Sequence, residues 1–314
     1  MQASRRDLLM AAAAAPLAAA TEIPRRTLGK TGLRVSIMGL GGARIGNLDD
    51  GKEAEAVIRR CYDLGVNYFD SAAAGAYGLS QKRYGPVLKS VRDKIVYGTK
   101  TRNRSATQSQ LDLDQSLANL QTDYIDLYQI HNVINDEDIE FIFGPKGVME
   151  TVEKARKAGK VRFVGVTGHT TPAVLNKIIG MYDFATVLMP LSVTDGGNAQ
   201  KSFEQQTLPL AKKKGMGVIA MKVLGAGAIL KNKAATVDEC LRYTWTLPVS
   251  TAIMGCDAVP HVDHNMALAR AAKPMTAMEM ETLRRRAARF DIAAVEPWKL
   301  GREEDPSGPV YRAD

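Results

Sequence analysis

The sequence predicts an α/β fold, a (β/α)₈ barrel of the TIM type that is preceded by a short β-hairpin. Three observations lead to this prediction. Apolar runs of strand length alternate with amphipathic stretches of helix length, no linker rich in Pro, Gly or Ser divides the chain, and the strand runs are continuously apolar. A parallel sheet buried on both faces requires such continuous runs. The 314 residues also suit a barrel of eight βα units.

The predicted elements follow one another in a regular order. Residues 26–34, with glycines at 29 and 32, predict the hairpin. The predicted strands are Val35–Leu40, Asn67–Asp70, Ile95–Thr99, Tyr124–Ile130, Val161–Val166, Ala185–Leu191, Gly217–Met221 and Thr251–Met254. The predicted helices include Ala54–Leu64, Gln108–Leu120, Val148–Ala158, Pro172–Ile179, Phe203–Lys214 and Val237–Thr246.

A doubly wound parallel sheet is the alternative architecture for this pattern. Residues 39–42 read GLGG, which lacks the spaced third glycine and the following helix of the usual dinucleotide-binding fingerprint. The barrel is therefore favoured.

The first twenty residues predict a leader rather than part of the fold. Residues 4–9 read SRRDLL, a twin-arginine pattern, and an apolar stretch from Leu8 to Ala20 follows, interrupted by Pro16. Three alanines precede Thr21 and offer a cleavage site. An Ala-rich disordered or helical leader is the alternative. We expect a signal peptide at 1–20, the barrel at 21–295, an irregular tail at 296–314 and export to the periplasm by the twin-arginine machinery.

Composition argues against several other classes of protein. Nothing after residue 20 approaches the roughly 18 consecutive apolar residues of a spanning helix, so no stable membrane insertion is expected after cleavage. The net charge is +8, but the basic residues fall in or near the leader and on helical faces, without interleaved aromatic residues. Nucleic-acid binding is therefore not expected.

The three cysteines, Cys61, Cys240 and Cys256, show no CxxC spacing, so no metal or cluster site is predicted. One disulfide is possible in an oxidising compartment. Buried thiols are the default expectation for Cys61 and Cys240, which lie among apolar neighbours in helical patterns.

Four polar residues fall where the active site of such a barrel lies, on the loops after the carboxyl ends of the strands. Asp70 ends the second predicted strand, Lys100 ends the third, His131 follows the fourth, and Tyr77 lies in the loop after Asp70. Each alone has an ordinary structural explanation: a helix cap, a surface charge, a buried histidine and a turn aromatic. Four such groups at consecutive strand ends predict proton-transfer chemistry. We refer to these four residues as the tetrad.

The sequence resembles the aldo-keto reductase family from Arg26 to about Arg270. The resemblance rests on Leu28–Ser36, Asn67–Ala72, Tyr77–Ser80, Gly98–Lys100 and Asp123–His131. It implies that Tyr77 is the general acid or base, that Lys100 lowers the pKa of Tyr77, that Asp70 pairs with Lys100, and that His131 orients the substrate oxygen. A free phenol has a pKa of about 10, and a nearby ammonium lowers it by stabilising the phenolate. Residues 164–169 and 216–227 resemble a branch that often carries a ferredoxin-like extension, but no cysteine follows Cys256.

The resemblance also implies a nicotinamide cofactor, NADP or NAD, which would supply the hydride. The implied cofactor contacts are Gly42, Ala43, Thr167, Gly168, Lys222, Gly225, Gly255, Cys256, Asp257 and Asn265. Two interpretations are open for Lys222: it contacts the cofactor pyrophosphate, or it is an ordinary surface lysine at the end of a strand. Asn265 is the expected adenine contact, whereas His261 and His264 are expected to be surface or capping residues.

Several positions depart from the family pattern. Thr167-Gly168 stands where Ser-Asn is common, and Leu188 and Leu191 replace the usual glutamine and stacking tyrosine beside the nicotinamide. Asp257 and Ala258 align roughly with the basic residues that bind a 2′-phosphate. A carboxylate there would repel this phosphate and accept from a ribose hydroxyl, so NAD stays open beside NADP.

The expected function is that of an NAD(P)-dependent oxidoreductase acting on a small polar substrate such as a sugar, lactone or aldehyde. His169 and Trp298 are candidate substrate contacts; the tail that contains Trp298 is expected either to cross the barrel mouth or to fray. Export favours a retained cofactor and a redox-neutral or epimerising reaction, because the cell envelope lacks a nicotinamide pool. The alternative is a non-catalytic nucleotide-binding barrel subunit.

Overall fold

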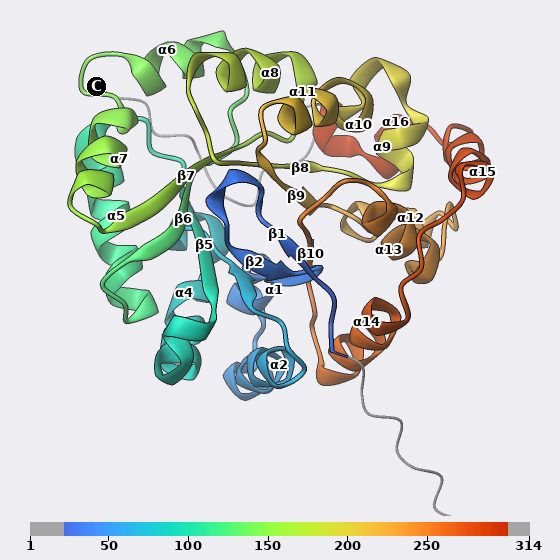
Figure 1. Cartoon of the computed structure of the whole chain (residues 1–314), viewed down its shortest axis with the longest axis horizontal. Coiled ribbons are helices and arrows are strands. Elements are labelled where there is room, and N and C mark those ends of the chain that lie inside the picture. Colours follow the sequence, from blue (N-terminus) through green and yellow to red (C-terminus); the bar gives the residue numbers. More distant parts are fainter. Residues whose placement is uncertain (1–21, 301–314) are drawn as a thin grey trace, which may run out of the picture.

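Eight parallel strands close into a barrel in the computed structural model, which describes residues 22–300 (Figure 1). The strands pair in the order β10-β3-β4-β5-β6-β7-β8-β9, so β10 closes the barrel against β3. They are β3 (Met38–Gly41), β4 (Tyr68–Asp70), β5 (Val96–Thr101), β6 (Ile125–Ile130), β7 (Val161–Thr167), β8 (Thr186–Pro190), β9 (Gly217–Met221) and β10 (Thr251–Met254). The predicted barrel is confirmed, and the doubly wound sheet is excluded. The expected leader lies outside the described residues.

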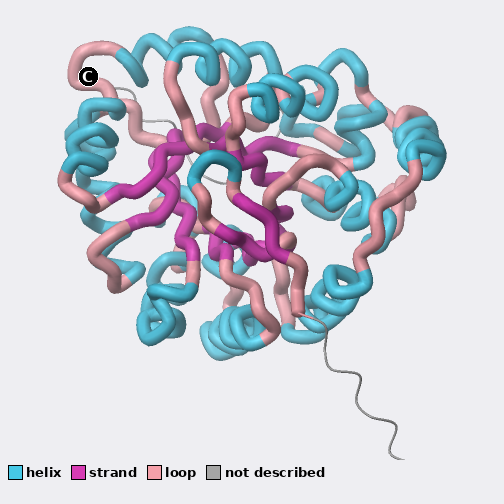
Figure 2. The backbone as a smooth tube through the Cα atoms, in the orientation of Figure 1, coloured by secondary structure: helices cyan, strands magenta, loops and turns pink. Residues whose placement is uncertain are grey.

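Helices surround the strands on the outside (Figure 2). The main α-helices are α2 (Gly51–Asp63), α4 (Ser80–Leu88), α5 (Ala106–Leu120), α6 (Asp136–Phe143), α7 (Val148–Lys157), α8 (Pro172–Met181), α11 (Leu208–Lys213), α13 (Val237–Thr246), α14 (Val259–Ala271) and α15 (Ala277–Ala287). Short helices are α1 (Gly42–Asn47), α3 (Ala74–Tyr77), α9 (Val193–Gly197), α10 (Phe203–Gln206), α12 (Ala228–Lys231) and α16 (Ile292–Val295). The 3₁₀ helices are η1 (Gly29–Thr31), η2 (Lys89–Lys94), η3 (Ala199–Lys201), η4 (Gly225–Gly227) and η5 (Pro297–Leu300).

The predicted hairpin is present and closes the amino-terminal end of the barrel. Its strands, β1 (Arg25–Thr27) and β2 (Arg34–Ser36), pair antiparallel and lie in front of the barrel in Figure 1. Leu28 and Val35 are fully buried and pack with apolar side chains from inside the barrel. Gly29 has φ +50, and a Cβ there would stand 2.0 Å from the Gly217 nitrogen, so the turn requires glycine.

Side chains on the strands alternate between the barrel interior and the helices outside. Toward the amino ends the inner positions are apolar, and Val96, Leu127 and Ile219 belong to one buried cluster with the hairpin. Toward the carboxyl side, Lys100 lies four residues after Val96 and Gln129 two residues after Leu127, so both point to the interior, and both are fully buried. The alternation along the strands therefore makes the barrel interior apolar toward the amino ends of the strands and polar toward their carboxyl ends.

Two elements that the sequence predicts as continuous are each divided in the structure. The first predicted strand is two strands, because the chain turns at Ile37 between the hairpin and the barrel, where the Ser36 hydroxyl donates to the Met38 carbonyl at 2.6 Å. The helix predicted over residues 203–214 is broken at Thr207 into α10 and α11. Pro209 supplies no backbone N–H, which favours a new helix start at this point.

The expected irregular tail begins as an ordered turn. The 3₁₀ helix η5 packs against the barrel with Trp298 and Lys299 buried. Lys299 Nζ is 2.5 Å from Asp195 Oδ1 and 2.8 Å from Glu296 Oε2. These buried ion pairs hold η5 against the rest of the protein. Residues 301–314 lie outside the described part of the chain.

The three cysteines are free and buried, so the disulfide that the sequence leaves open does not form in the structure. Over residues 22–300, no helix has both the length and the apolar character needed to cross a membrane.

Candidate active site

The structure brings the tetrad together at the carboxyl-terminal end of the barrel. Asp70 is the last residue of β4, Lys100 lies near the end of β5, and His131 directly follows β6. Tyr77 ends the short helix α3, which returns the chain toward these strands after Asp70. Because parallel strands end on the same side of a barrel, residues 30 to 60 positions apart in the chain face one another here.

Lys100 and Asp70 form a buried ion pair. Lys100 Nζ is 2.6 Å from Asp70 Oδ2 and donates to the Ser71 carbonyl at 2.7 Å. Burial raises the pKa of Asp70 and lowers the pKa of Lys100, and the attraction between the two charges opposes both shifts. A buried pair pays a large desolvation cost and adds little net stability. The catalytic use of these two charges stays a prediction.

The ring of Tyr77 lies between the ammonium and the imidazole of the tetrad. Lys100 Nζ is 4.7 Å from the centroid of the Tyr77 ring. The Tyr77 and His131 rings meet edge to face, with centroids 6.0 Å apart. Tyr77 itself is half-buried. The phenol therefore borders both groups that the resemblance pairs it with.

A buried arginine that the sequence analysis did not identify holds the backbone beside His131. One guanidinium nitrogen of Arg104, NH2, donates to the His131 carbonyl at 2.9 Å and to the Asn132 carbonyl at 3.1 Å. Two nitrogens of Arg104 also bond the Asp138 carboxylate. The Thr167 hydroxyl oxygen accepts from the Asn132 N–H at 2.7 Å, where Asn132 has φ +52. These contacts fix the turn that aims His131, and the nicotinamide contact of Thr167 stays a prediction.

His131 is neutral at ordinary pH. Burial lowers its pKa well below the usual value, and electrostatic interactions with Lys100, His169, Arg102 and Arg104 lower it further. His169, which the sequence analysis proposed as a substrate contact, is half-buried, and its ring centroid lies 5.8 Å from that of His131. The two imidazoles thus form one polar wall of the barrel mouth.

The predicted pyrophosphate contacts gather after β9. Lys222 has φ +54, and Gly225, Ala226 and Gly227 also adopt positive φ, so the loop after the strand makes repeated left-handed turns. The ring of Trp298 covers the ammonium of Lys222, with Nζ 4.3 Å from the ring centroid. Trp298 therefore lies at the loop after β9. The cofactor contacts predicted for this loop and the substrate contact predicted for Trp298 stay predictions.

The predicted adenosine contacts gather after β10. The Asn265 amide donates to Cys256 Sγ at 3.7 Å, and both residues are buried, whereas Gly255 is exposed. Asp257 forms a bidentate ion pair with Arg44 on α1, with distances of 2.6 and 2.8 Å. Hydrogen bonding to this guanidinium lowers the pKa of Asp257. Arg44 is a second residue that the sequence analysis did not identify. Its position as a basic residue just after the first barrel strand could have indicated a role at the barrel mouth.

Gly42 and Ala43 begin α1, and Gly168 directly follows β7. A Cβ on Gly42 would stand 2.5 Å from the Asp70 carbonyl oxygen, so only glycine lets α1 approach β4. Ala43 follows on the same helix, and the Gly168 N–H donates to the Leu188 carbonyl at 3.2 Å. Their cofactor contacts stay predictions. His261 and His264 are exposed on α14, as expected.

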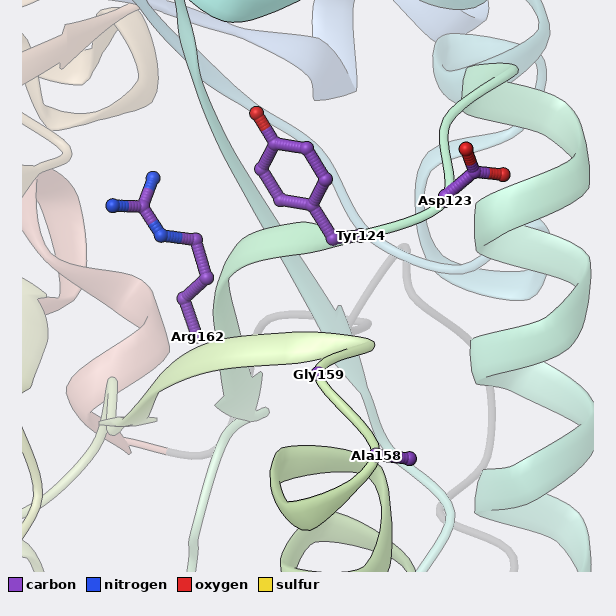
Figure 3. Close-up of a pocket in the computed structure, with 5 residues that line it drawn as sticks. All are labelled: Asp123, Tyr124, Ala158, Gly159 and Arg162. Atoms are coloured by element: carbon purple, nitrogen blue, oxygen red, sulfur yellow. The ribbon is translucent and has the colours of Figure 1, made fainter.

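A surface hollow of about 450 Å³ lies at the other end of the barrel. Its lining, drawn in Figure 3, is Asp123, Tyr124, Ala158, Gly159 and Arg162. These residues precede or begin β6 and β7, so the hollow is separated from the tetrad by the length of the strands. In residues 22–300 no group of three His, Cys, Asp or Glu side chains is placed to hold a metal ion.

Comparison with known proteins identifies the family. The family model described as "Aldo/keto reductase family" matches residues 37–240. The chain belongs to the aldo/keto reductase family. It is 30% identical to L-galactose dehydrogenase of Arabidopsis thaliana, over 84% of this chain and 93% of that protein. It is 27% identical to 6-dehydroglucose reductase of Novosphingobium aromaticivorans, over 67% of this chain and 72% of that protein.

The fold also matches a solved member of this family. The holo form of an aldo-keto reductase from Bacillus halodurans superposes with a TM-score of 0.72, at 24% identity, over 84% of this chain and 96% of that chain. With these matches the chain is an NAD(P)-dependent oxidoreductase that interconverts carbonyls and alcohols, and the non-catalytic alternative is set aside.

Proposed function

We propose that this oxidoreductase acts on a small polyhydroxylated substrate, a sugar or its lactone, at the barrel mouth. The observation that carries the proposal is the polar wall of His131 and His169, with Arg102 and Asn132 buried beside it. Imidazole, guanidinium and amide groups bond the hydroxyls and ring oxygens of a sugar, whereas an apolar substrate offers them no hydrogen-bonding group. Two relatives bear names of enzymes acting on sugars or sugar derivatives, L-galactose dehydrogenase and 6-dehydroglucose reductase, which supports this class.

The tetrad supplies the proton chemistry of this reaction. In the reducing direction, negative charge develops on the substrate oxygen, and the Tyr77 hydroxyl protonates it. The Lys100 ammonium stabilises the resulting phenolate, and Asp70 keeps that ammonium charged inside the barrel. Neutral His131 donates a hydrogen bond to the same oxygen. In the oxidising direction the phenolate takes the hydroxyl proton.

The ends of β9 and β10 fit a dinucleotide. Lys222 offers an ammonium, Arg44 a guanidinium, and α14 the amino terminus of a helix of 13 residues, all of which suit phosphate groups. Asn265 and Asp257 offer an amide and a carboxylate for the adenosine. When bound, the nicotinamide supplies or accepts the hydride. Because Arg44 neutralises Asp257, the carboxylate alone does not decide between NAD and NADP.

The leader supports a second part of the proposal, export with the cofactor already bound. The twin-arginine route carries folded proteins, and the cell envelope has no nicotinamide pool to recharge a released cofactor. A retained cofactor restricts turnover to redox-neutral chemistry, in which one carbon is oxidised and then reduced again or two substrates react in turn. The buried turn that places Trp298 over Lys222 is consistent with slow release.

Two measurements test the proposal. A screen of aldoses, their lactones and apolar aldehydes of similar size should give kcat/KM at least tenfold higher for the polyhydroxylated compounds. The variant Tyr77→Phe should abolish turnover of the best substrate and leave nucleotide affinity within about twofold. A preference for apolar aldehydes would contradict the substrate class, and unchanged turnover would remove Tyr77 from the mechanism.

Cofactor retention is measured on mature protein purified without added nucleotide. Its absorbance spectrum and the nucleotide released on denaturation should show about one cofactor per chain. Protein free of nucleotide, with micromolar or weaker affinity for both cofactors, would refute retention while leaving the substrate class untouched.

A further inference from the structure

Beneath the ion pair of Lys100 and Asp70, glycines on the inner face of the barrel let polar side chains of neighbouring strands approach closely. A Cβ on Gly98 of β5 would stand 2.4 Å from Tyr68 Oη and 3.5 Å from Asp70 Oδ1. The phenol of Tyr68 and the second oxygen of Asp70 thus lie near each other beside Gly98. Neither atom has a hydrogen-bond partner, because Lys100 bonds the other oxygen, Oδ2.

The same arrangement recurs on other strands. A Cβ on Gly165 of β7 would stand 2.3 Å from Thr186 Oγ1 and 3.0 Å from the Gln129 side chain. Around the barrel, a Cβ on Gly39 would stand 3.3 Å from Thr251 Oγ1. Both ends of the Gln129 amide and both threonine hydroxyls are buried without a hydrogen-bond partner.

We call these side chains the inner polar layer; its members are Tyr68, Asp70, Gln129, Thr186 and Thr251. Each of the five is 1% exposed or less. Buried polar groups in proteins are nearly always bonded, either to protein or to ordered water, and each unpaired group costs about 1–3 kcal/mol. Buried water typically occupies such sites, where two to four polar partners converge. The barrel interior usually holds bulky branched side chains instead.

We propose that the inner polar layer binds ordered water inside the barrel, and that Tyr68 and Gln129 act through this water as positioning residues. They keep Asp70 ionised and paired with Lys100. This inference rests on the oxidoreductase function described above and assigns no group that touches substrate or cofactor. The proton machinery then has three layers: Tyr77 and His131 at the mouth, the ion pair of Lys100 and Asp70 below them, and hydrogen-bond donors below the pair.

The chemistry of the layer suits this role. Burial and the nearby Asp70 charge raise the pKa of Tyr68 well above its usual value, so this phenol keeps its proton and can only be a donor toward a carboxylate. The Gln129 amide lies close enough to lower the pKa of Asp70 without a direct hydrogen bond of normal geometry. A carboxylate that gains donors holds its charge more firmly.

The titratable groups around Asp70 come from several elements. Lys100 extends from β5, Tyr77 from α3 and His131 from β6, while Tyr68 shares the strand of Asp70. Tyr84, on α4, also responds to the charge of Asp70. Of these groups, Lys100 is the cation that contacts Asp70 directly. The protonation of Asp70 therefore depends on Lys100 and on the donors of the inner polar layer.

A first experiment needs no substrate. A crystal structure at high resolution should show ordered water within hydrogen-bond distance of Tyr68 Oη and Asp70 Oδ1. In infrared spectra, Tyr68→Phe should show at pH 6 a protonated carboxyl band that is absent from the wild type and disappears in Tyr68→Phe/Asp70→Asn. An interior without water, or identical spectra, would overturn the proposal even if the substrate class proves correct.

A second experiment measures kcat/KM against pH for oxidation of an active sugar alcohol or aldose. Loss of the Tyr68 donor should leave Lys100 less firmly charged and raise the pKa of the catalytic phenol. The acid limb of the profile should then move upward by about one pH unit. A uniform drop at every pH, with no shift, would indicate a merely structural role and refute the proposal.

Two further variants separate hydrogen bonding from packing. Tyr97→Phe removes a buried phenol from the outer face of β5 and should leave both the infrared spectrum and the pH profile unchanged. Tyr68→Phe/Gly98→Ala places a methyl group close to the position that the Tyr68 hydroxyl vacates and restores packing without a donor. It should keep the shifted profile of Tyr68→Phe; a return to the wild-type profile would contradict the proposal.

Discussion

Each end of the barrel holds a buried aspartate, and the two aspartates differ in how many of their hydrogen-bonding positions are filled. At the amino end, Asp126 on β6 accepts from Arg92 at 2.7 Å, from Arg162 at 2.6 Å and from the Tyr97 N–H at 3.0 Å. At the carboxyl end, Asp70 has one lysine and one oxygen without a hydrogen-bond partner. Both carboxylates are about 1% exposed. The first is saturated by its partners, whereas the second keeps unused acceptor capacity.

The difference shows how to distinguish structural from catalytic charge in this fold. Arg92 also lies 3.9 Å from the centroid of the Tyr124 ring, so the amino-end cluster is tied together by several kinds of contact. These several contacts hold the strands together, and they keep the carboxylate and the guanidinium groups in their charged forms. The ion pair of the tetrad lacks such a set of contacts, and its two charges oppose the burial that would neutralise them. Proton transfer needs this second arrangement.

The largest effect is expected for Lys100→Met. Turnover should fall on the order of 10³-fold, because the charge that stabilises the phenolate is lost. The free energy of unfolding should also fall by about 3–5 kcal/mol, since Asp70 is left as an uncompensated buried charge. Steady-state kinetics and urea unfolding measure the two effects. Lys30→Met is the control: it breaks a surface pair with Asp183 and should change stability by less than about 1 kcal/mol.

The matching change at the amino end is Asp126→Asn. It should lower the free energy of unfolding by about 2 kcal/mol, because two guanidinium groups lose their shared carboxylate while Arg162 stays partly in water. The value of kcat should remain within about twofold of wild type. Urea unfolding and kinetics on one preparation check both numbers. A large loss of kcat in a folded Asp126→Asn protein would break the distinction between the two ends.

The sequence predicts the barrel and the tetrad for the same reason. Each buried strand is a continuous apolar run, and a polar residue at its carboxyl end stands out against that run. Asp70, Lys100 and His131 can therefore be recognised in the sequence as polar residues at the ends of strands. The roles of Arg44 and Arg104 depend on partners 213 and 34 residues away, and no local pattern indicates such pairing.

Two other features follow from three-dimensional packing alone. Gln129 lies within the predicted fourth strand, yet its position in the inner polar layer depends on the missing side chain of Gly165. Lys299 stands in a polar segment that the sequence predicts to be irregular. Its burial depends on Asp195, 104 residues earlier in the chain. In both cases the decisive partner is a tertiary neighbour.

A smaller effect is expected for the pH dependence of stability. The pKa of His131 is lowered in the folded state, so the unfolded chain binds more protons below about pH 6.5, and stability falls as the pH is lowered. Between pH 8 and pH 5, His131→Asn should lose at least ~1 kcal/mol less than the wild type. Urea unfolding at the two pH values measures this difference. The exposed His264→Asn should behave like wild type, and equal pH dependence of all three proteins would show that His131 is protonated inside the fold.

The smallest effect concerns cofactor choice at the rim of the mouth, where charges are exposed and screened. Asp257→Asn removes the carboxylate that binds Arg44 and frees the guanidinium to meet a 2′-phosphate. The ratio of NADP to NAD affinity should rise by about fivefold, a modest change because both side chains are partly exposed to water. Fluorescence titration of the two reduced cofactors measures the ratio, and the effect should weaken as salt is added. Asp263→Asn, which breaks the exposed pair with Arg60 on the neighbouring helix face, is the matched control and should leave the ratio unchanged. An unchanged ratio in Asp257→Asn would place the phosphate away from Arg44 and confine the electrostatic control of this site to the buried pair of Lys100 and Asp70.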